Sequence, residues 1–368
     1  MKKTIKTIAA LTILALATPA IAGGVTVAEQ GDSKLKLGAK FFTNFTANKT
    51  QGDGTAAGNA LIQKKDMGAA LDRAYFSLKY QFDDVWSMSL TTDANIDTGL
   101  AKKTTNVFIK KAYLRGKLAD EFVISAGVIG TPFIGYENKL NTHRYVHKSF
   151  TDTYKFDDSA DAGIGISGKL ADGLIQYSIA ELNGGGFGNI SRNNSLDFNS
   201  RVGIYPIEGL TLDVQFRDGF RSSKVFNKAN QANNAGTKHT LIQGMITYGV
   251  DKTFRIGGNY IYEKSDQKLD VANAIAQQTT KSTGLDVWGW VNFNDNVGVF
   301  GQFEQLKQKR AAGAQPKTTR FVGGLEFTAR KNVRLALVAD VSKTTDAAFT
   351  TGAVIKTSKF GLYSEVKF

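Results

Sequence analysis

The sequence has no cysteine among its 368 residues, so no disulfide can form. Proline is also scarce, at four residues. After residue 22 the chain also has no run of even ten apolar residues, which excludes transmembrane helices. Glycine, at 38 residues, and aromatic residues, at 11%, are frequent instead. This composition is typical of a chain built from strands and turns, in which alternation dilutes the apolar residues.

The first 22 residues have the pattern of a secretory signal peptide. The basic start MKKTIK precedes an apolar run, Ile8 to Ala17, and Ala20 and Ala22 form a small-residue cleavage site. The apolar run is too short to cross a bilayer. The alternative is a buried N-terminal helix. We expect cleavage after Ala22 and one mature domain over residues 23–368.

The formal net charge is +13. A basic exported protein can attract anions, nucleic acid or lipid phosphate. No run of five or more like charges occurs, so a nucleic-acid partner is not expected. The basic residues are scattered and often fall on one side of alternating segments.

Apolar and polar residues alternate from Lys34 to the C-terminus. In LTLDVQF, for example, leucine, valine and phenylalanine alternate with threonine, aspartate and glutamine over residues 210–216. The last ten residues, KFGLYSEVKF, show the same pattern. Each such segment is predicted to be a strand with one apolar face.

Two kinds of connection alternate along the chain. Seven are short and rich in Asp, Asn and Gly, such as Asp83-Asp84 and Asn294-Asp295-Asn296. Eight are mostly long and polar, at roughly 48–69, 97–105, 131–160, 183–195, 219–237, 265–282, 309–316 and 346–351. These connections predict an all-β fold, a 16-stranded antiparallel transmembrane β-barrel with short periplasmic turns and long extracellular loops.

Aromatic residues beside the short turns fit this orientation. They belong to the apolar faces of their strands and predict a periplasmic girdle at the lipid interface. The alternative is that aromatic residues simply favour strands. The residues are Phe82, Trp86, Phe122, Tyr248, Phe254, Phe293 and Phe327.

The polar faces of the strands are expected to line an aqueous channel with a basic wall, which would favour anions. The alternative for each residue alone is a solvated charge with no selective role. The predicted basic wall residues are Lys36, Lys40, Arg73, Lys79, Lys111, Arg115, Arg201, Arg217, Arg255, Arg320 and Arg334. The predicted inward acidic residues are Asp93, Asp213, Glu263, Glu326 and Asp340.

The longest loop, residues 131–160, follows the fifth predicted strand. Its six aromatic residues argue against disorder, so we expect it to fold into the lumen and narrow the pore. The alternative is an extracellular cap. The predicted constriction residues are Lys139, Arg144, Lys148 and Lys155, together with Glu137, and they are opposed by Asp152, Asp157 and Asp158.

Several stretches, among them SAGVIGTPFIGYENKLNTHRYVHKSF, SADAGIGISGKL and IAELNGGGFG, resemble bacterial outer-membrane porins related to the phosphate- and pyrophosphate-selective (O/P-type) porins. The resemblance extends over roughly residues 70–220. It implies a sixteen-stranded barrel, usually a homotrimer, with the loop after strand 5 in the channel. The long loop has a single arginine, Arg144, which argues against phosphate specificity. General or loosely anion-preferring diffusion is therefore the expectation.

No catalytic, cofactor-binding or metal-binding residues are predicted. His143 and His147 are spaced like a ligand pair on a helix, but no cysteine or third histidine stands near and the loop is not clearly helical, so we interpret them as solvated loop residues. The leading hypothesis is therefore a passive porin for small anionic or neutral hydrophilic solutes, in the outer membrane of a Gram-negative bacterium. The alternatives are an adhesin or structural barrel, and a hydrolase with its site at the rim.

The segment KFGLYSEVKF is predicted to be the last strand, with Phe360, Leu362, Val366 and Phe368 facing lipid. It must pair with the first strand to close the barrel. By resemblance to the porins, this terminal aromatic strand is also the signal read by the outer-membrane assembly machinery.

Overall fold

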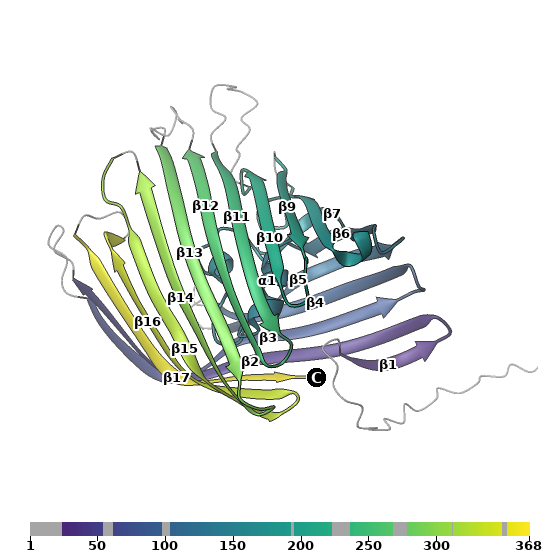
Figure 1. Cartoon of the computed structure of the whole chain (residues 1–368), viewed down its shortest axis with the longest axis horizontal. Helices are drawn as coiled ribbons and strands as arrows, with labels where there is room; N and C mark the ends of the chain where they lie inside the picture. The colour runs from purple at the N-terminus through teal and green to yellow at the C-terminus, as the bar shows by residue number, and fades with distance from the viewer. Residues whose placement is uncertain are drawn as a thin grey trace, which may run out of the picture.

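The computed structural model describes residues 24–53, 62–97, 104–192, 195–222, 236–267, 278–310, 312–347 and 352–368. The predicted signal peptide lies outside these residues. Seventeen strands dominate the described chain, and the helices are short (Figure 1). None of these helices is long and apolar enough to cross a bilayer.

The strands follow one another along the chain with few other elements. Their bounds are β1 Val25–Gln30, β2 Ser33–Asp53, β3 Ile62–Gln81, β4 Trp86–Asp97, β5 Thr104–Lys117, β6 Val123–Gly130, β7 Ala160–Leu170, β8 Ile175–Leu182, β9 Asp197–Ile204, β10 Thr211–Gly219, β11 Thr237–Val250, β12 Phe254–Gln267, β13 Gln278–Asn292, β14 Val297–Arg310, β15 Lys317–Arg330, β16 Val333–Thr345 and β17 Val354–Lys367. The helices are α1 Ile134–Asn141, α2 Phe150–Thr153 and the 3-10 turn η1 Ala171–Gly173.

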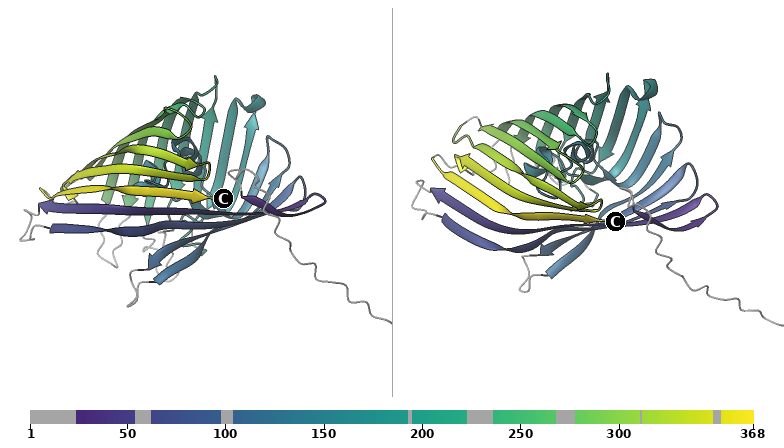
Figure 2. Two further views of the ribbon diagram at one scale, coloured as in Figure 1. Left: turned by 90° about the horizontal axis from the view of Figure 1, so that it is seen from below. Right: turned by 60° about the horizontal axis from the view of Figure 1, so that its bottom comes forward.

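Sixteen of these strands, β2 to β17, form a closed antiparallel barrel, as the alternation predicted. Each strand pairs with its sequence neighbours, and β17 pairs with β2 from Val354↔Asp53 to Lys367↔Lys40. Figure 2 shows this seam as yellow strands beside purple ones. Phe368 extends it, because its backbone N–H donates to the Ala39 carbonyl at 3.1 Å. Closure removes both sheet edges, as expected.

The two faces of the strands differ as the alternation predicts. In β10, Leu212, Val214 and Phe216 are exposed on the outside, while Asp213 and Gln215 are buried on the inside. The four predicted lipid-facing residues of β17, Phe360, Leu362, Val366 and Phe368, are all exposed. All seven predicted girdle aromatics keep solvent-accessible surface, six of them more than a third exposed and Phe254 half-buried.

The connections also divide as expected. Turns of two to six residues join β3 to β4, β5 to β6 and so on to β15 and β16, all at the end of the barrel where β17 finishes. The predicted bounds of the first long loop are too wide, because β2 reaches Asp53 and β3 begins at Ile62. The outer parts of these strands carry polar side chains on both faces and therefore show no alternation.

One strand was not predicted. β1 pairs with the start of β2 between Val25↔Leu37 and Gln30↔Ser33, beyond the point where the β17 ladder ends. All six of its residues are exposed. The β1–β2 hairpin therefore adds a short strand outside the sixteen-strand ring.

The segment after β6, the fifth strand of the ring, lies inside the barrel. It contains α1 and α2, and its aromatic residues are buried or partly buried against inward-facing side chains of the wall. In Figure 2 its helical ribbon is enclosed between the green and blue strands. The hydroxyl of Thr131 donates to the Asp158 carbonyl at 2.5 Å and closes the base of the loop. The expectation of a lumenal loop is therefore confirmed.

Candidate functional site: the lumenal loop and the channel constriction

The loop is fastened to the wall first at α1. The Arg201 guanidinium of β9 stacks on the Tyr136 ring, with 3.3 Å between the guanidinium carbon and the ring centroid. Arg201 also pairs with Asp213 of β10 at 2.5 Å. Further along the loop, the indole N–H of Trp290 on β13 donates to the Leu140 carbonyl at 3.1 Å. Arg201 therefore positions the loop and is buried beneath it.

Three buried carboxylates meet next to α1. They are Glu137 of the loop, Asp286 of β13 and Glu304 of β14. The amide nitrogen of Asn259 donates to Glu137 at 2.8 Å and to Asp286 at 2.9 Å. The amide nitrogen of Gln302 donates to Asp286 at 2.8 Å and to Glu304 at 3.1 Å. We call Glu137, Asp286 and Glu304 the carboxylate cluster.

A second anchor surrounds Tyr145 in the middle of the loop. Its ring packs among inward-facing apolar side chains of β2 and β14–β17, and its hydroxyl donates to Glu326 at 2.6 Å. Arg334 of β16 lies over the same ring, 4.7 Å from its centroid. Arg334 also pairs with Glu365 at 2.8 Å and donates to the Thr142 carbonyl at 2.9 Å.

The third anchor lies at the end of the loop. Asp157 accepts hydrogen bonds from Asn199 at 2.8 Å and from Gln215 at 2.9 Å. Arg217 donates to the Phe156 carbonyl at 2.8 Å and pairs with Asp197 at 2.7 Å. Burial raises the pKa of Asp157, and nearby Arg217 opposes the increase.

The other side of the loop faces β3–β5, where basic side chains gather. Arg73 pairs with Asp93 at 2.8 Å, and Lys110 lies 3.5 Å from the same carboxylate. On the loop, Asp152 is surrounded by Arg144 at 3.4 Å, Lys148 at 3.7 Å and Lys155 at 4.0 Å. We call these seven residues the constriction cluster.

The wall and loop parts of this cluster act on one another. Lys110 lies within electrostatic range of Arg73, Arg144 and Asp152, and Lys148 lies within range of Arg73. Five cations therefore meet two carboxylates, and a net positive charge remains where the loop approaches the wall. The field of such a cluster attracts anions and repels cations.

Lys110 was not predicted to face the lumen. A bulge between Thr91 and Thr92 shifts the register opposite Lys110, so Lys110 and Lys111 both turn inward. The Lys110 ammonium lies 5.0 Å from the Tyr75 ring centroid and 4.8 Å from that of Phe187. Strict alternation places only one of two consecutive residues in the lumen, so the pattern of the chain carries no signal for this side chain.

A second basic group lies toward the short turns. Lys36 stands directly opposite Lys79 across β2 and β3, and Arg115 is within electrostatic range of Lys79. Within the described part of the chain, no carboxylate lies within 4.0 Å of these three cations. They share this lack of a close carboxylate with Lys111, among the predicted wall residues.

The other predicted wall residues are distributed more widely. Lys40 lies 3.7 Å from Glu365, and Arg320 pairs with Asp340 at 2.7 Å and Glu304 at 3.4 Å. Arg255 donates to the Thr247 hydroxyl at 3.4 Å near the turns. Lys111 is half-buried near Gly130 at the loop base, within electrostatic range of the exposed Lys139. Glu263 lies 3.5 Å from His239 of the neighbouring strand.

The expectation of solvated histidines was wrong. His143 and His147 are only 4% and 7% exposed. The His143 ring stacks on Phe300 at 4.1 Å and lies 3.4 Å from Glu326. Burial, with Arg320 nearby, lowers the pKa of His147 to about 3. Among the described residues, no group of three or more His, Cys, Asp or Glu side chains is arranged so that it could hold a metal ion.

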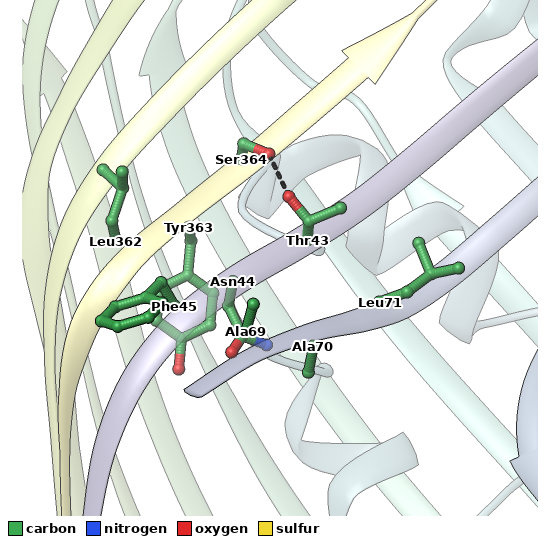
Figure 3. Close-up of a pocket in the computed structure, with 9 residues that line it drawn as sticks. All are labelled: Thr43, Asn44, Phe45, Ala69, Ala70, Leu71, Leu362, Tyr363 and Ser364. Carbon is green, nitrogen blue, oxygen red and sulfur yellow. Dashed lines mark hydrogen bonds between the residues drawn. The ribbon is translucent and has the colours of Figure 1, made fainter. Parts of the chain in front are cut away.

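The outer surface has a shallow groove between β17, β2 and β3 (Figure 3). The hydroxyls of Thr43 and Ser364 bond to each other at 2.7 Å in its centre. Phe45, Ala69 and Leu362 are exposed around them. This polar pair lies within an otherwise apolar outer face.

No protein-family model matches the sequence, and no curated protein matches it either. Solved structures do match in fold. OmpT, an outer membrane protein of Vibrio cholerae, is 12% identical with a TM-score of 0.65, covering 93% of this chain and 99% of that one. An anion-selective porin from Comamonas acidovorans is 10% identical with a TM-score of 0.61, covering 91% and 100%.

The outer membrane channel DcaP of Acinetobacter baumannii is 10% identical, with a TM-score of 0.60 and coverage of 94% and 100%. A trimer form of in-vitro folded OmpT matches with a TM-score of 0.56 and 13% identity, covering 90% and 99%. At these identities the likeness establishes the fold, an outer-membrane type of β-barrel, and no O/P-type assignment follows from it.

Proposed function

We propose that this chain is an outer-membrane porin of a Gram-negative bacterium, a water-filled channel through which small hydrophilic solutes diffuse passively, with a preference for anions. The constriction cluster is the observation that carries the proposal. Arg73 and Lys110 on the wall face Arg144 and Lys148 on the loop, with only Asp93 and Asp152 to oppose them. The barrel fold supports it, as does the likeness to an anion-selective porin.

The anion preference follows from this imbalance of charge. A narrow aqueous passage with low-dielectric walls concentrates the field of its lining charges. Selection in such a pore depends on size and field rather than on a fixed set of contacts. We therefore infer general anion-preferring diffusion without phosphate specificity, and no catalytic role.

Planar bilayer recording under a KCl gradient tests the proposal. The purified protein should give large ohmic steps whose reversal potential favours chloride. Replacing Arg144 and Lys148 together by glutamine should move the reversal potential toward potassium while preserving conductance. Arg330→Gln with Lys331→Gln is the matched control, because both residues are exposed where β15 ends and the short turn to β16 begins.

Two results would count against the proposal. A folded protein that gives no conductance would favour the adhesin or structural alternative. An unchanged reversal potential in the Arg144 and Lys148 variant would remove the constriction cluster from selectivity while leaving the channel itself intact.

We further propose a homotrimer in which the groove of Figure 3 contacts a second copy. The small side chain of Ala69, beside the Thr43–Ser364 hydroxyl pair, would allow a second copy to approach closely. The contact would also shield the two hydroxyls from lipid. Ala69→Phe should lower the yield of the trimer on semi-native gels. Val214→Phe, an enlargement at an exposed outer position of β10, should not. Equal trimer yields from both variants would reject this face.

A further inference from the structure

We propose that the carboxylate cluster makes the lumenal loop a proton-dependent latch, which holds α1 against the wall while the cluster shares protons and releases it as the pH rises. The inference goes beyond the proposed function, since it depends on the position of the loop and not on the solute. It rests on the geometry around Glu137, which is fully enclosed between α1 and the wall.

The cluster has too few cations for its carboxylates. Glu137 and Asp286 accept from one nitrogen of Asn259, so the two carboxylates lie within a few ångströms of each other. Asp286 and Glu304 share Gln302 in the same way and stand directly opposite across β13 and β14. Buried carboxylates at such separations do not all ionise together.

The elements packed around the cluster supply one nearby cation. β15 contributes Arg320, which lies 3.4 Å from Glu304 but makes a closer pair with Asp340 of β16 at 2.7 Å. β11 contributes the amide of Gln243, and β12 contributes that of Asn259. The loop adds the hydroxyls of Thr151 and Tyr154, the latter donating to Glu304 at 3.0 Å.

The sign of the effect follows from Glu137. Burial, reinforced by the nearby Asp286 carboxylate, raises the pKa of Glu137 in the docked loop. A released loop would return this side chain to water and to the ordinary pKa range. The contribution of Glu137 to docking is therefore fully present below its ordinary pKa, and it is lost as the pH rises from there through the raised pKa.

A cysteine reporter can follow the release, because the chain has no cysteine of its own. Ser149 is 2% exposed between the two helices of the docked loop. The Ser149→Cys variant would be labelled with a methanethiosulfonate reagent in detergent micelles. Its labelling rate is divided by the labelling rate of an Asp251→Cys variant, which removes the pH dependence of thiol ionisation. The Asp251 side chain is fully exposed in a turn.

The ratio of the two labelling rates should rise by about fivefold or more between about pH 7 and about pH 9.5. One linked proton sets the upper limit, about tenfold per pH unit. Adding Glu137→Gln should make the ratio nearly independent of pH, and Asp286→Asn should reduce the slope. Glu208→Gln, at an exposed turn position, is the matched control and should leave the rise unchanged.

A flat ratio in the Ser149→Cys protein would overturn the proposal, and so would an equal rise in the Glu137→Gln background. Circular dichroism at each pH separates loop release from barrel unfolding, and a loss of strand signal parallel to labelling would also refute the latch. Ion selectivity is measured separately, so the failure of one inference does not imply the failure of the other.

Discussion

Tyr145 offers the sharpest test of how the loop is held. Its side chain is 1% exposed, and its hydroxyl donates to Glu326 at 2.6 Å. Tyr145→Phe keeps the ring and removes only this bond to a carboxylate, which costs about 1.5–3 kcal/mol. Tyr145→Ala also removes the buried ring, and a loss of about 3–5 kcal/mol is expected. Both costs apply to loop docking, since the barrel ladder does not include this residue.

Limited trypsin digestion measures the docking equilibrium. Arg144 and Lys148 flank Tyr145 and are partly covered in the docked loop, so cleavage after them requires release. Cleavage of a transiently opened segment follows its population. The rate should rise about 10- to 150-fold in Tyr145→Phe and about 150-fold or more in Tyr145→Ala, because 1.4 kcal/mol corresponds to a factor of ten.

Mass spectrometry of the new chain ends separates these cuts from cleavage elsewhere. Tyr260→Phe is the matched control, because Tyr260 is exposed on the outer face of β12. Cleavage rates equal to wild type in both Tyr145 variants, with the barrel intact, would refute the claim that this side chain fastens the loop.

The remaining predictions concern assembly, selectivity and acid. Deleting Phe368 removes the last bonds to Ala39 and should lower the yield of assembled barrel on heat-modifiability gels, with unchanged conductance in the molecules that assemble. Asp152→Asn should strengthen the anion preference in reversal-potential measurements, and a shift toward cations would contradict the charge argument. Because the pKa of His147 is lowered in the docked loop, its contribution to docking is fully present above the ordinary histidine pKa and is lost as the pH falls from about 6.5 toward 3. Current noise from loop motion should therefore rise in acid, and His147→Gln should suppress that rise.

The barrel could be predicted because its chemistry repeats along the chain. Outward positions such as Val214 and Phe216 must be apolar and the positions between them need not be, so the alternation marks each strand inside the bilayer. Beyond the bilayer this constraint ends. The ends of β2 and β3 next to their connecting loop therefore show no alternation, although their hydrogen-bond ladder continues to Gly52 and Ile62. β1 was missed because it is only six residues long and its apolar side consists of Val25 and Val27 alone.

The site was harder to predict because it depends on distant contacts. The sequence placed a basic loop in the lumen, but not the meeting of Glu137 with Asp286, which lie far apart along the chain. It also treated Arg201 and Arg334 as channel charges, whereas the structure pairs both with carboxylates beneath the loop. The inward orientation of Lys110 follows only from the strand register, which shifts at the bulge opposite it.

The three anchors of the loop have a mechanical consequence for the barrel. A ring of strands resists bending along its hydrogen-bond ladder more weakly when its interior is only water. Here the loop leaves the wall at β6, crosses the interior to side chains of β14–β17 and returns at β7. It therefore braces the barrel from within, so that lateral pressure from surrounding lipid is opposed by packed side chains as well as by the ladder, most of all beside β14–β17.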